Sequence, residues 1–217
     1  PYTLEEVVSR DYLLKEKPDV IIDLVDATNI ERNLYLATQL LEIGIPVVIA
    51  LNMVDLLKKN NININVKGLS SALGCPIVET SALKGTGLKE VVDEAIKCAN
   101  QHRVPSKQME FPKAVEKAVN EIEEFVPETI AKENRRWYAV KLLERDSKVK
   151  EGLSLPVSAQ SRIEEIASKL EQTEDDDTES IVTDGRYQYI QKVVSANVKR
   201  SGNKMTVSDK IDRIVTN

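Results

Sequence analysis

Three short runs rich in valine and isoleucine place the strongest constraint on how this chain can fold. They lie at 20–26 (VIIDLVD), 46–52 (PVVIALN) and 76–80 (PIVET). Runs that do not alternate regularly with polar residues are typical of strands covered on both faces. Segments with helical spacing separate them, at 4–15, 31–43, 67–73 and 87–99. Because strands that alternate with helices are usually parallel, the pattern predicts an α/β fold with a parallel sheet and flanking helices.

The chain changes character after Arg103. Charged residues number 25 among the first 103 positions and 40 among the remaining 114. Four stretches of the second half show helical spacing, which predicts an all-α bundle or array; they centre on Val115–Val126, Trp137–Leu143, Ala159–Leu170 and Tyr187–Asn197. We therefore predict two domains, 1–103 and 104–217, joined by the polar segment 103–108 (RVPSKQ).

The overall charge bears on the class of partner. With 30 Lys and Arg against 35 Asp and Glu, the net charge of -5 argues against a nucleic-acid binder, which is usually basic. No apolar run approaches the roughly 20 residues of a membrane helix, so we expect a soluble chain. Cys75 and Cys98 fit neither a disulfide framework nor a metal site, as in a reducing cytosol. The acidic segment 171–178 (EQTEDDDT) is interpreted as a mobile, solvated loop, and the single histidine, His102, as a solvated linker residue.

Polar residues follow each of the three predicted strands, at 26–29 (DATN), 52–55 (NMVD) and 80–85 (TSALKG). Ligands of open α/β sheets bind at the carboxyl ends of the strands. A carboxylate there, such as that of Asp55, can accept two parallel hydrogen bonds from N1–H and the 2-amino group of guanine. Adenine lacks both donors on that edge, so it would leave the carboxylate desolvated and unpaired.

Two further groups complete a predicted guanine pocket. Asn52 can reach the other edge of the base and tie the neighbouring loop in place. The turn of Ser81, Ala82 and Leu83 offers the Ala82 N–H to the guanine 6-oxygen. An NxxD segment alone is weak, since Asn at a strand end is often only a turn former, but the TSALKG segment one βα unit later strengthens it. Asp26 with Asn29 is at least as well explained as a helix N-cap.

The NMVD and TSALKG segments resemble the fourth and fifth guanine-nucleotide motifs of the small GTPase superfamily. The longer strings PDVIIDLVDATNIERNLYLATQLLEIGIPVVIALNMVD, RWYAVKLLERD, DGRYQYI and SDKIDRIV resemble the bacterial ferrous-iron transport protein B family. The resemblance covers nearly the whole chain. It implies the later portion of a P-loop GTPase-type G domain followed by a helical domain, which leads in that family to a polytopic membrane domain that passes Fe²⁺.

The resemblance also implies function and partners. It makes the chain a cytosolic regulatory region that couples GTP or GDP state to Fe²⁺ uptake, at the cytoplasmic face of a bacterial membrane. The base would contact Asn52, Met53, Asp55 and the turn of Ser81, Ala82 and Leu83. Mg²⁺ would act in the parent protein, the membrane transport domain of the same polypeptide would be the partner, no nucleic acid is expected, and an oligomer is possible.

Two departures from the GTPase pattern limit what the chain can do. It contains neither a GxxxxGK[ST] loop nor a DxxG segment, so Pro1 is expected to begin inside a truncated G domain. Phosphoryl transfer depends on positioning and neutralising the phosphates, so we expect no GTP hydrolysis by these 217 residues. Met53 stands where most GTPases have Lys, which predicts modest affinity. The strand left at the sheet edge is expected to be an aggregation hazard.

Two other functions stay open at this point. One is a soluble GTPase of ribosome or tRNA maturation with a helical appendage, although the 19 basic and 21 acidic residues after Arg103 disfavour RNA binding. The other is an interaction module without a ligand. Among single residues, Trp137, Arg186 and Tyr187 are interpreted as packing residues. Lys210 and Arg213, in the segment 208–215, would suit a juxtamembrane position.

Overall fold

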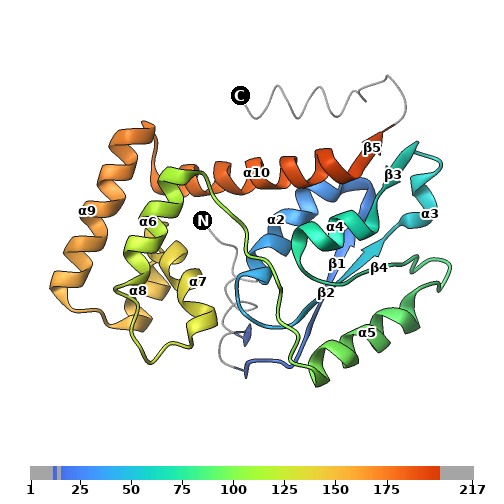
Figure 1. Cartoon of the computed structure of the whole chain (residues 1–217), viewed down its shortest axis with the longest axis horizontal. Coiled ribbons are helices and arrows are strands. Elements are labelled where there is room, and N and C mark those ends of the chain that lie inside the picture. The colour runs from blue at the N-terminus through green and yellow to red at the C-terminus, as the bar shows by residue number, and fades with distance from the viewer. Residues whose placement is uncertain (1–11, 14–15, 201–217) are drawn as a thin grey trace.

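The computed structural model describes residues 12–13 and 16–200 (Figure 1). Its first half holds a parallel sheet in the order β1-β2-β4, in which Ile21 pairs with Val47 and Ile49 with Ile77. The elements of this half are β1 (Ile21–Asp26), the short helix η1 (Ala27–Asn29), α2 (Ile30–Leu41), β2 (Val47–Asn52), α3 (Val54–Leu57), β3 (Ile62–Ile64), α4 (Val66–Leu73), β4 (Ile77–Glu79) and α5 (Leu88–Asn100). The predicted parallel sheet with flanking helices is confirmed.

The sheet is covered unequally on its two faces. Helices α2 and α4 pack on one face and α5 packs on the other (Figure 1). All six residues of β2 are buried, as predicted for a strand covered on both sides. For β1 that prediction is wrong, because Ile22 is 47% exposed and Leu24 65% exposed. The reason is position: β1 ends the strand order among the described residues, and α5 lies mainly over β2.

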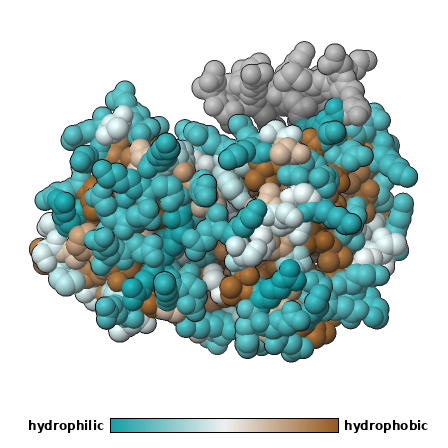
Figure 2. Space-filling model, in the orientation of Figure 1, coloured by the Kyte–Doolittle hydropathy of each residue, from teal (hydrophilic) through white to brown (hydrophobic). Residues whose placement is uncertain are grey.

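The second half of the chain is helical. It comprises α6 (Lys113–Glu123), α7 (Lys132–Leu143), α8 (Ser147–Leu153), α9 (Val157–Glu174) and α10 (Thr178–Asn197), followed by the short strand β5 (Val198–Arg200). Figure 2 shows mostly hydrophilic side chains over the visible face of this half. Trp137 is 2% exposed in the core that α6, α7 and α9 share, so its interpretation as a packing residue is confirmed.

Helices occupy most of the acidic segment 171–178, so its interpretation as a mobile, solvated loop is wrong except at 175–177, which join two helices; residues 172–177 are exposed, as predicted. Residues 171–174 form the last turn of α9, and Thr178 begins α10. Asp177 caps α10 by accepting from the Ser180 N–H at 2.9 Å. Arg145 donates to both oxygens of Glu171, at 2.5 and 2.9 Å, and these bonds hold the pKa of Glu171 below its usual value. A nearby cation therefore offsets the repulsion that would otherwise favour an extended chain.

Helix α10 spans both halves of the molecule (Figure 1). Its first turns pack in the core of the helical half. Further along, Ile190 and Val193 pack against α2 and α4, in the core that these helices share with the sheet. Between these two stretches lies Arg186, which is fully buried and donates to Glu42 Oε2 at 2.7 Å. The neighbouring Tyr187 stacks on Tyr35 of α2, with ring centroids 5.1 Å apart. Both residues are packing residues, as predicted, and they hold α10 against α2.

Some predictions fall elsewhere. The helix over 4–15 lies mostly outside the described residues, and the segment 208–215 with Lys210 and Arg213 lies wholly outside them. The antiparallel pair of β3 and β5 has no counterpart among the predicted elements. The division at 103/104 stays a prediction, and α10 crosses between the two cores.

Replacing Arg186 with Met should lower the free energy of unfolding by about 3–5 kcal/mol, because it leaves Glu42 buried without its counter-charge. The matched control is Arg162→Met, whose partner Glu165 and whose own side chain are both more than half exposed. That change should cost about 0–1 kcal/mol. Urea denaturation followed by circular dichroism measures both, and equal effects would contradict a structural role for the buried pair.

Asp23 predicts a specific pH dependence of stability. This residue of β1 is 7% exposed, its Oδ2 has no hydrogen-bond partner among the described residues, and burial raises its pKa to about 6. The folded state therefore holds the proton more tightly than the unfolded state, and stability falls as pH rises from about 4 to above 6. Two pKa units correspond to about 3 kcal/mol. In Asp23→Asn this loss should disappear, so unfolding curves of both proteins between pH 4 and 8 should diverge; parallel profiles would contradict the assignment.

Candidate functional site

The predicted site is built where β2 and β4 end side by side. The side chain of Asn52, the last residue of β2, accepts a hydrogen bond from the Ala82 N–H at 3.0 Å. Thr80 Oγ1 donates to the same oxygen at 3.5 Å, and the Thr80 N–H donates to the Leu51 carbonyl at 2.8 Å. Asn52 is 9% exposed. The amide thus joins two strand ends that are 30 residues apart in sequence.

The turn that follows β4 is closed by its own backbone. Ser81 and Thr86 form an isolated antiparallel bridge, and the Lys84 N–H donates to Ser81 Oγ at 3.4 Å. Gly87 follows with φ +76°, and a Cβ atom there would collide with the Glu79 carbonyl. Ser81 is buried, whereas Leu83 is 88% exposed at the tip. The turn therefore has a fixed base and an exposed apolar tip.

Met53 and Asp55 lie beside this turn. Met53 adopts the left-handed conformation, with φ 65°, and precedes α3. The Val54 N–H donates to the Thr80 carbonyl at 3.4 Å, which holds the start of α3 against the end of β4. Asp55, in the first turn of α3, is half-buried, and its carboxylate has no hydrogen bond or ion pair with any described residue. An unpartnered carboxylate next to a closed turn can accept hydrogen bonds from a ligand.

One predicted hydrogen-bond donor has a different acceptor from the one that we expected. The Ala82 N–H, which we expected to face the guanine 6-oxygen, donates to Asn52 in this structure. The reason is that the Asn52 side chain ties the loop through that donor. The loop-tying contact of Asn52 has the expected partners, while the roles of all six residues toward a base stay predictions.

The 26–29 turn lies against the same region, since η1 packs on α3. Asp26 Oδ1 accepts from the Thr28 N–H at 2.8 Å and from Thr28 Oγ1 at 2.7 Å, and Asp26 Oδ2 accepts from Asn29 Nδ2 at 3.0 Å. Burial alone would raise the pKa of Asp26, but these bonds outweigh it and lower the pKa. Asp26 caps η1, whereas Asn29 makes no side-chain cap to α2. The predicted N-cap is that of the helix that starts near Glu31, which is α2, and for that helix it is wrong: Asp26 caps the short η1 that precedes α2.

The cysteines and the histidine contribute no reactive group to this site. Cys75 and Cys98 are buried free thiols, and burial raises the pKa of Cys75 to about 12 and also raises that of Cys98. His102 is exposed, in a left-handed turn after α5. Within the described part of the chain, no three His, Cys, Asp or Glu side chains gather in a way that could hold a metal ion.

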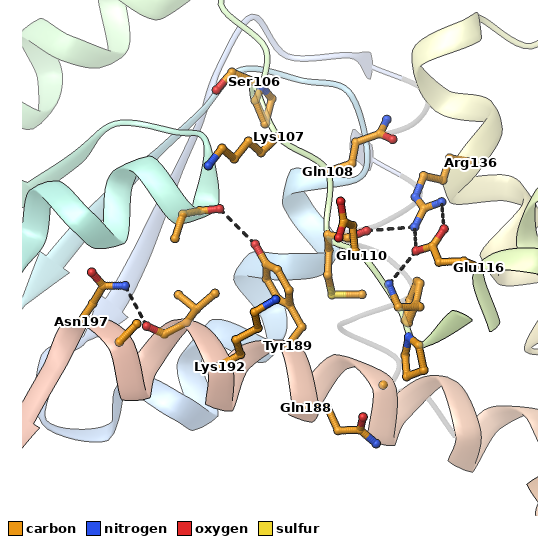
Figure 3. Close-up of a pocket in the computed structure, with 18 residues that line it drawn as sticks. Ser106, Lys107, Gln108, Glu110, Glu116, Arg136, Gln188, Tyr189, Lys192 and Asn197 are labelled. Atoms are coloured by element: carbon orange, nitrogen blue, oxygen red, sulfur yellow. Dashed lines mark hydrogen bonds and ion pairs between the residues drawn. The ribbon is translucent and has the colours of Figure 1, made fainter. Parts of the chain in front are cut away.

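A separate cavity of about 1140 Å³ lies between the linker and α10, and none of the six predicted site residues lines it (Figure 3). Lys107 and Gln108 border it from the linker, and Gln188, Lys192 and Asn197 border it from α10. Arg136 forms its far wall, where it donates to both oxygens of Glu116, at 3.0 and 2.7 Å. No motif in the sequence marks this cavity, because its walls come from segments that are far apart in the chain.

Comparison with known proteins places the two halves in one family. The family model described as Ferrous iron transport protein B matches residues 1–95. The model described as FeoB cytosolic helical domain matches residues 111–199. A solved relative, a mutant of S. thermophilus NFeoB bound to GDP, is 42% identical and is covered over 76% of its length. The chain belongs to the ferrous iron transport protein B family. This decides against the soluble GTPase of ribosome or tRNA maturation.

Curated members of the ferrous iron transport protein B family match the whole chain. The Fe(2+) transporter FeoB of Escherichia coli (strain K12) is 34% identical over 99% of this chain. The Fe(2+) transport protein A/Fe(2+) transporter FeoB fusion protein of Porphyromonas gingivalis is 36% identical over 100% of it. The chain spans about a quarter of the length of these relatives, 27% of each. Within residues 12–13 and 16–200, no helix has both the length and the apolar character needed to cross a membrane.

Solved structures of the family share the fold. The GDP-bound S. thermophilus mutant superposes with a TM-score of 0.84 over 92% of this chain. The S. thermophilus NFeoB bound to GDP.AlF4- and K+ is 44% identical, with a TM-score of 0.81 over 90% of this chain and 76% of its own. A third, bound to mGMPPNP, is 41% identical, with a TM-score of 0.81 over 94% of this chain and 76% of its own. The first half therefore has a parallel sheet with flanking helices like that of a G domain, and a helical domain follows it.

Replacing Asn52 with Ala should loosen the turn at 81–86, because the Ala82 N–H loses its acceptor. Ala82 is exposed, so water can take the place of the Asn52 oxygen, and the net loss should be about 0.5–1.5 kcal/mol. Hydrogen–deuterium exchange should show faster exchange of the Ala82 amide and a matching loss of stability. The control is Asn60→Ala, at an exposed residue whose side chain has no partner among the described residues. Unchanged exchange at Ala82 in the Asn52 variant would contradict the loop-tying role.

Proposed function

We propose that this chain binds the guanine base of GDP or GTP at Asn52, Met53, Asp55 and the turn of Ser81, Ala82 and Leu83. The observation that carries the proposal is the junction of the two strand ends by Asn52, next to the Asp55 carboxylate, which has no partner within the part of the chain that the structure describes. The solved S. thermophilus relatives, which are bound to GDP, mGMPPNP or GDP.AlF4-, support it.

The chemistry of the base explains why Asp55 selects guanine. Its carboxylate accepts from N1–H and from the 2-amino group as a charge-assisted bidentate pair. Adenine has neither donor on that edge, so binding it would desolvate Asp55 without compensation. Base specificity thus depends on one side chain, while Asn52 holds the turn that closes the pocket.

The proposed site consists of groups that would contact the base and includes none that would bind the phosphates or Mg²⁺. The 217 residues contain no GxxxxGK[ST] loop, whose backbone amides and lysine hold phosphates. The chain therefore holds the nucleotide through its base, and we assign neither the phosphates nor Mg²⁺ to any residue of it. For the same reason the chain does not hydrolyse GTP on its own.

In the parent protein, this chain acts as the cytosolic regulatory region of a membrane Fe²⁺ transporter. The match to the cytosolic helical domain model and to Fe(2+) transporters almost four times as long supports this role. The membrane transport domain of the same polypeptide is its partner, at the cytoplasmic face of the membrane. Nucleotide state at the base pocket would reach that domain through the helical half, which α10 holds to the sheet.

Calorimetric titration tests the proposal. GDP should bind this chain and ADP should not. Asp55→Asn should weaken GDP binding at least about tenfold, because the amide presents a donor where the base also presents one. The matched control is Asp93→Asn, an exposed residue of α5 that pairs with Lys89, and its GDP affinity should equal that of the unmodified chain.

Three outcomes separate the possibilities. Selective GDP binding that Asp55→Asn removes supports the base pocket. Absence of binding at millimolar GDP contradicts nucleotide binding by these residues and leaves the chain as the scaffold and relay portion of the parent protein. Phosphate release from GTP, measured on the same samples, should stay at the buffer rate, and any turnover would overturn the assignment of hydrolysis to other parts of the parent protein.

A further inference from the structure

Two short strands that are not predicted from the sequence join distant parts of the chain. Strand β3, at 62–64, pairs antiparallel with β5, at 198–200, and Asn63 lies opposite Lys199. Strand β3 follows the predicted base loop by a few residues, and β5 follows directly after α10 (Figure 1). The pair therefore links the surroundings of Asp55 to the end of the helix that spans both halves.

The segment from the base loop to β3 is short and continuously hydrogen-bonded. The Leu56 N–H donates to the Met53 carbonyl at 3.0 Å, and the Asn60 N–H donates to the Leu56 carbonyl at 3.0 Å. The Asn61 N–H then donates to the Lys58 carbonyl at 3.2 Å. Leu57 is buried in the core under the sheet. A displacement of α3 therefore moves the start of β3 with it, because no slack lies between them.

The end of α10 is fastened to the residue that follows β3. The Asn65 N–H donates to the Asn197 carbonyl at 2.7 Å, and Asn65 Oδ1 caps α4 by accepting from the Gly68 N–H at 3.0 Å. The Asn197 side chain is 9% exposed and donates to the Val193 carbonyl at 2.8 Å (Figure 3). Gly68 leaves room for it, since a Cβ there would overlap both Asn197 Oδ1 and Asn65 Nδ2. These contacts, with β3 and β5, are called the latch below.

We infer that the latch, at the end of α10, closes when a base occupies the base pocket. The inference rests on the proposed function, and it names the route by which that site is regulated. A base that pairs with Asp55 restrains α3, and α3 restrains β3 through the bonded segment. Closure of the latch then follows from base binding. By thermodynamic reciprocity, opening the latch must weaken base binding by the factor by which the base favours closure.

Hydrogen–deuterium exchange of the full chain, measured by mass spectrometry, tests the forward direction. Saturating GDP should slow exchange in peptides that cover 62–64 and 198–200, and ADP at the same concentration should not. A latch that is merely structural would show the same exchange with and without GDP. Slowed exchange confined to residues around Asp55 would therefore overturn the inference.

Gly68→Ala tests the reverse direction. Alanine is a better helix former than glycine, so the change does not weaken the interior of α4. Its Cβ displaces the Asn197 and Asn65 side chains together, which opens the latch and also disturbs the N-cap of α4. The GDP dissociation constant should rise at least about fivefold, the low end of typical coupling between sites. Gly152→Ala is the matched control, because Gly152 also lies in a helix and a Cβ there would meet nothing within 4 Å. Its affinity should be unchanged.

A second variant covers the case in which Gly68→Ala does not fold. In Asn63→Cys with Lys199→Cys, oxidation locks the two strands together, and the reduced sample is its own control. Oxidation should lower the GDP dissociation constant, and an unchanged constant would overturn the inference. Failure of the unmodified chain to bind GDP at all contradicts the proposed function first and the inference with it. GDP binding without a response at 198–200 overturns the inference alone.

Discussion

The buried ion pair between Arg186 and Glu42 is the contact on which the arrangement of the two halves depends. Both side chains are almost completely inaccessible, at 0% and 2% exposure. A charge removed from water costs several kcal/mol unless a counter-charge compensates it, so α10 and α2 have little freedom to slide past each other. The Phe111 ring lies 5.3 Å from the Arg186 guanidinium, and Asn134 donates to the Ile43 carbonyl just beyond Glu42. The segment before α6 and helix α7 thus meet the chain at the end of α2 around the same charge.

Contacts between distant parts of the chain, such as this one, set the limit on what the sequence predicts. Local patterns identify β2, β4 and the amphipathic helices, because burial of one face leaves a period in the residues. The pair of β3 and β5 leaves no such record: each strand has three residues, and the pairing joins Ile62 to Arg200 across the whole chain. The error at 171–178 has the opposite cause, because Arg145, in the turn between α7 and α8, supplies a charge that no local pattern contains.

The candidate site divides in the same way. The spacing of NMVD and TSALKG, placed after buried strands, is sufficient to predict that Asn52 meets the following turn. It does not predict which donor of the turn Asn52 uses, since that depends on how closely β2 and β4 end together. Nor does it predict the left-handed backbone of Met53, which turns the chain from the end of β2 into α3. Residue types thus predict the chemistry, and tertiary contacts decide the geometry.

If the proposed function holds, different residues bind the base and the phosphates, and the two groups contribute separately to the binding free energy. The end of β2, which carries Asn52, and the start of α3, which carries Asp55, are held by contacts with β4 and the neighbouring helices, and these lie within the described residues. Phosphate affinity comes instead from backbone amides and a lysine in a GxxxxGK[ST] loop. Discrimination between guanine and adenine is the difference between the binding free energies of two nucleotides that carry the same phosphates. The contribution of a phosphate loop is the same for both nucleotides, so it cancels from that difference. A chain that holds only the base contacts therefore loses affinity while it keeps its selectivity, and the selectivity is the property that belongs to Asp55.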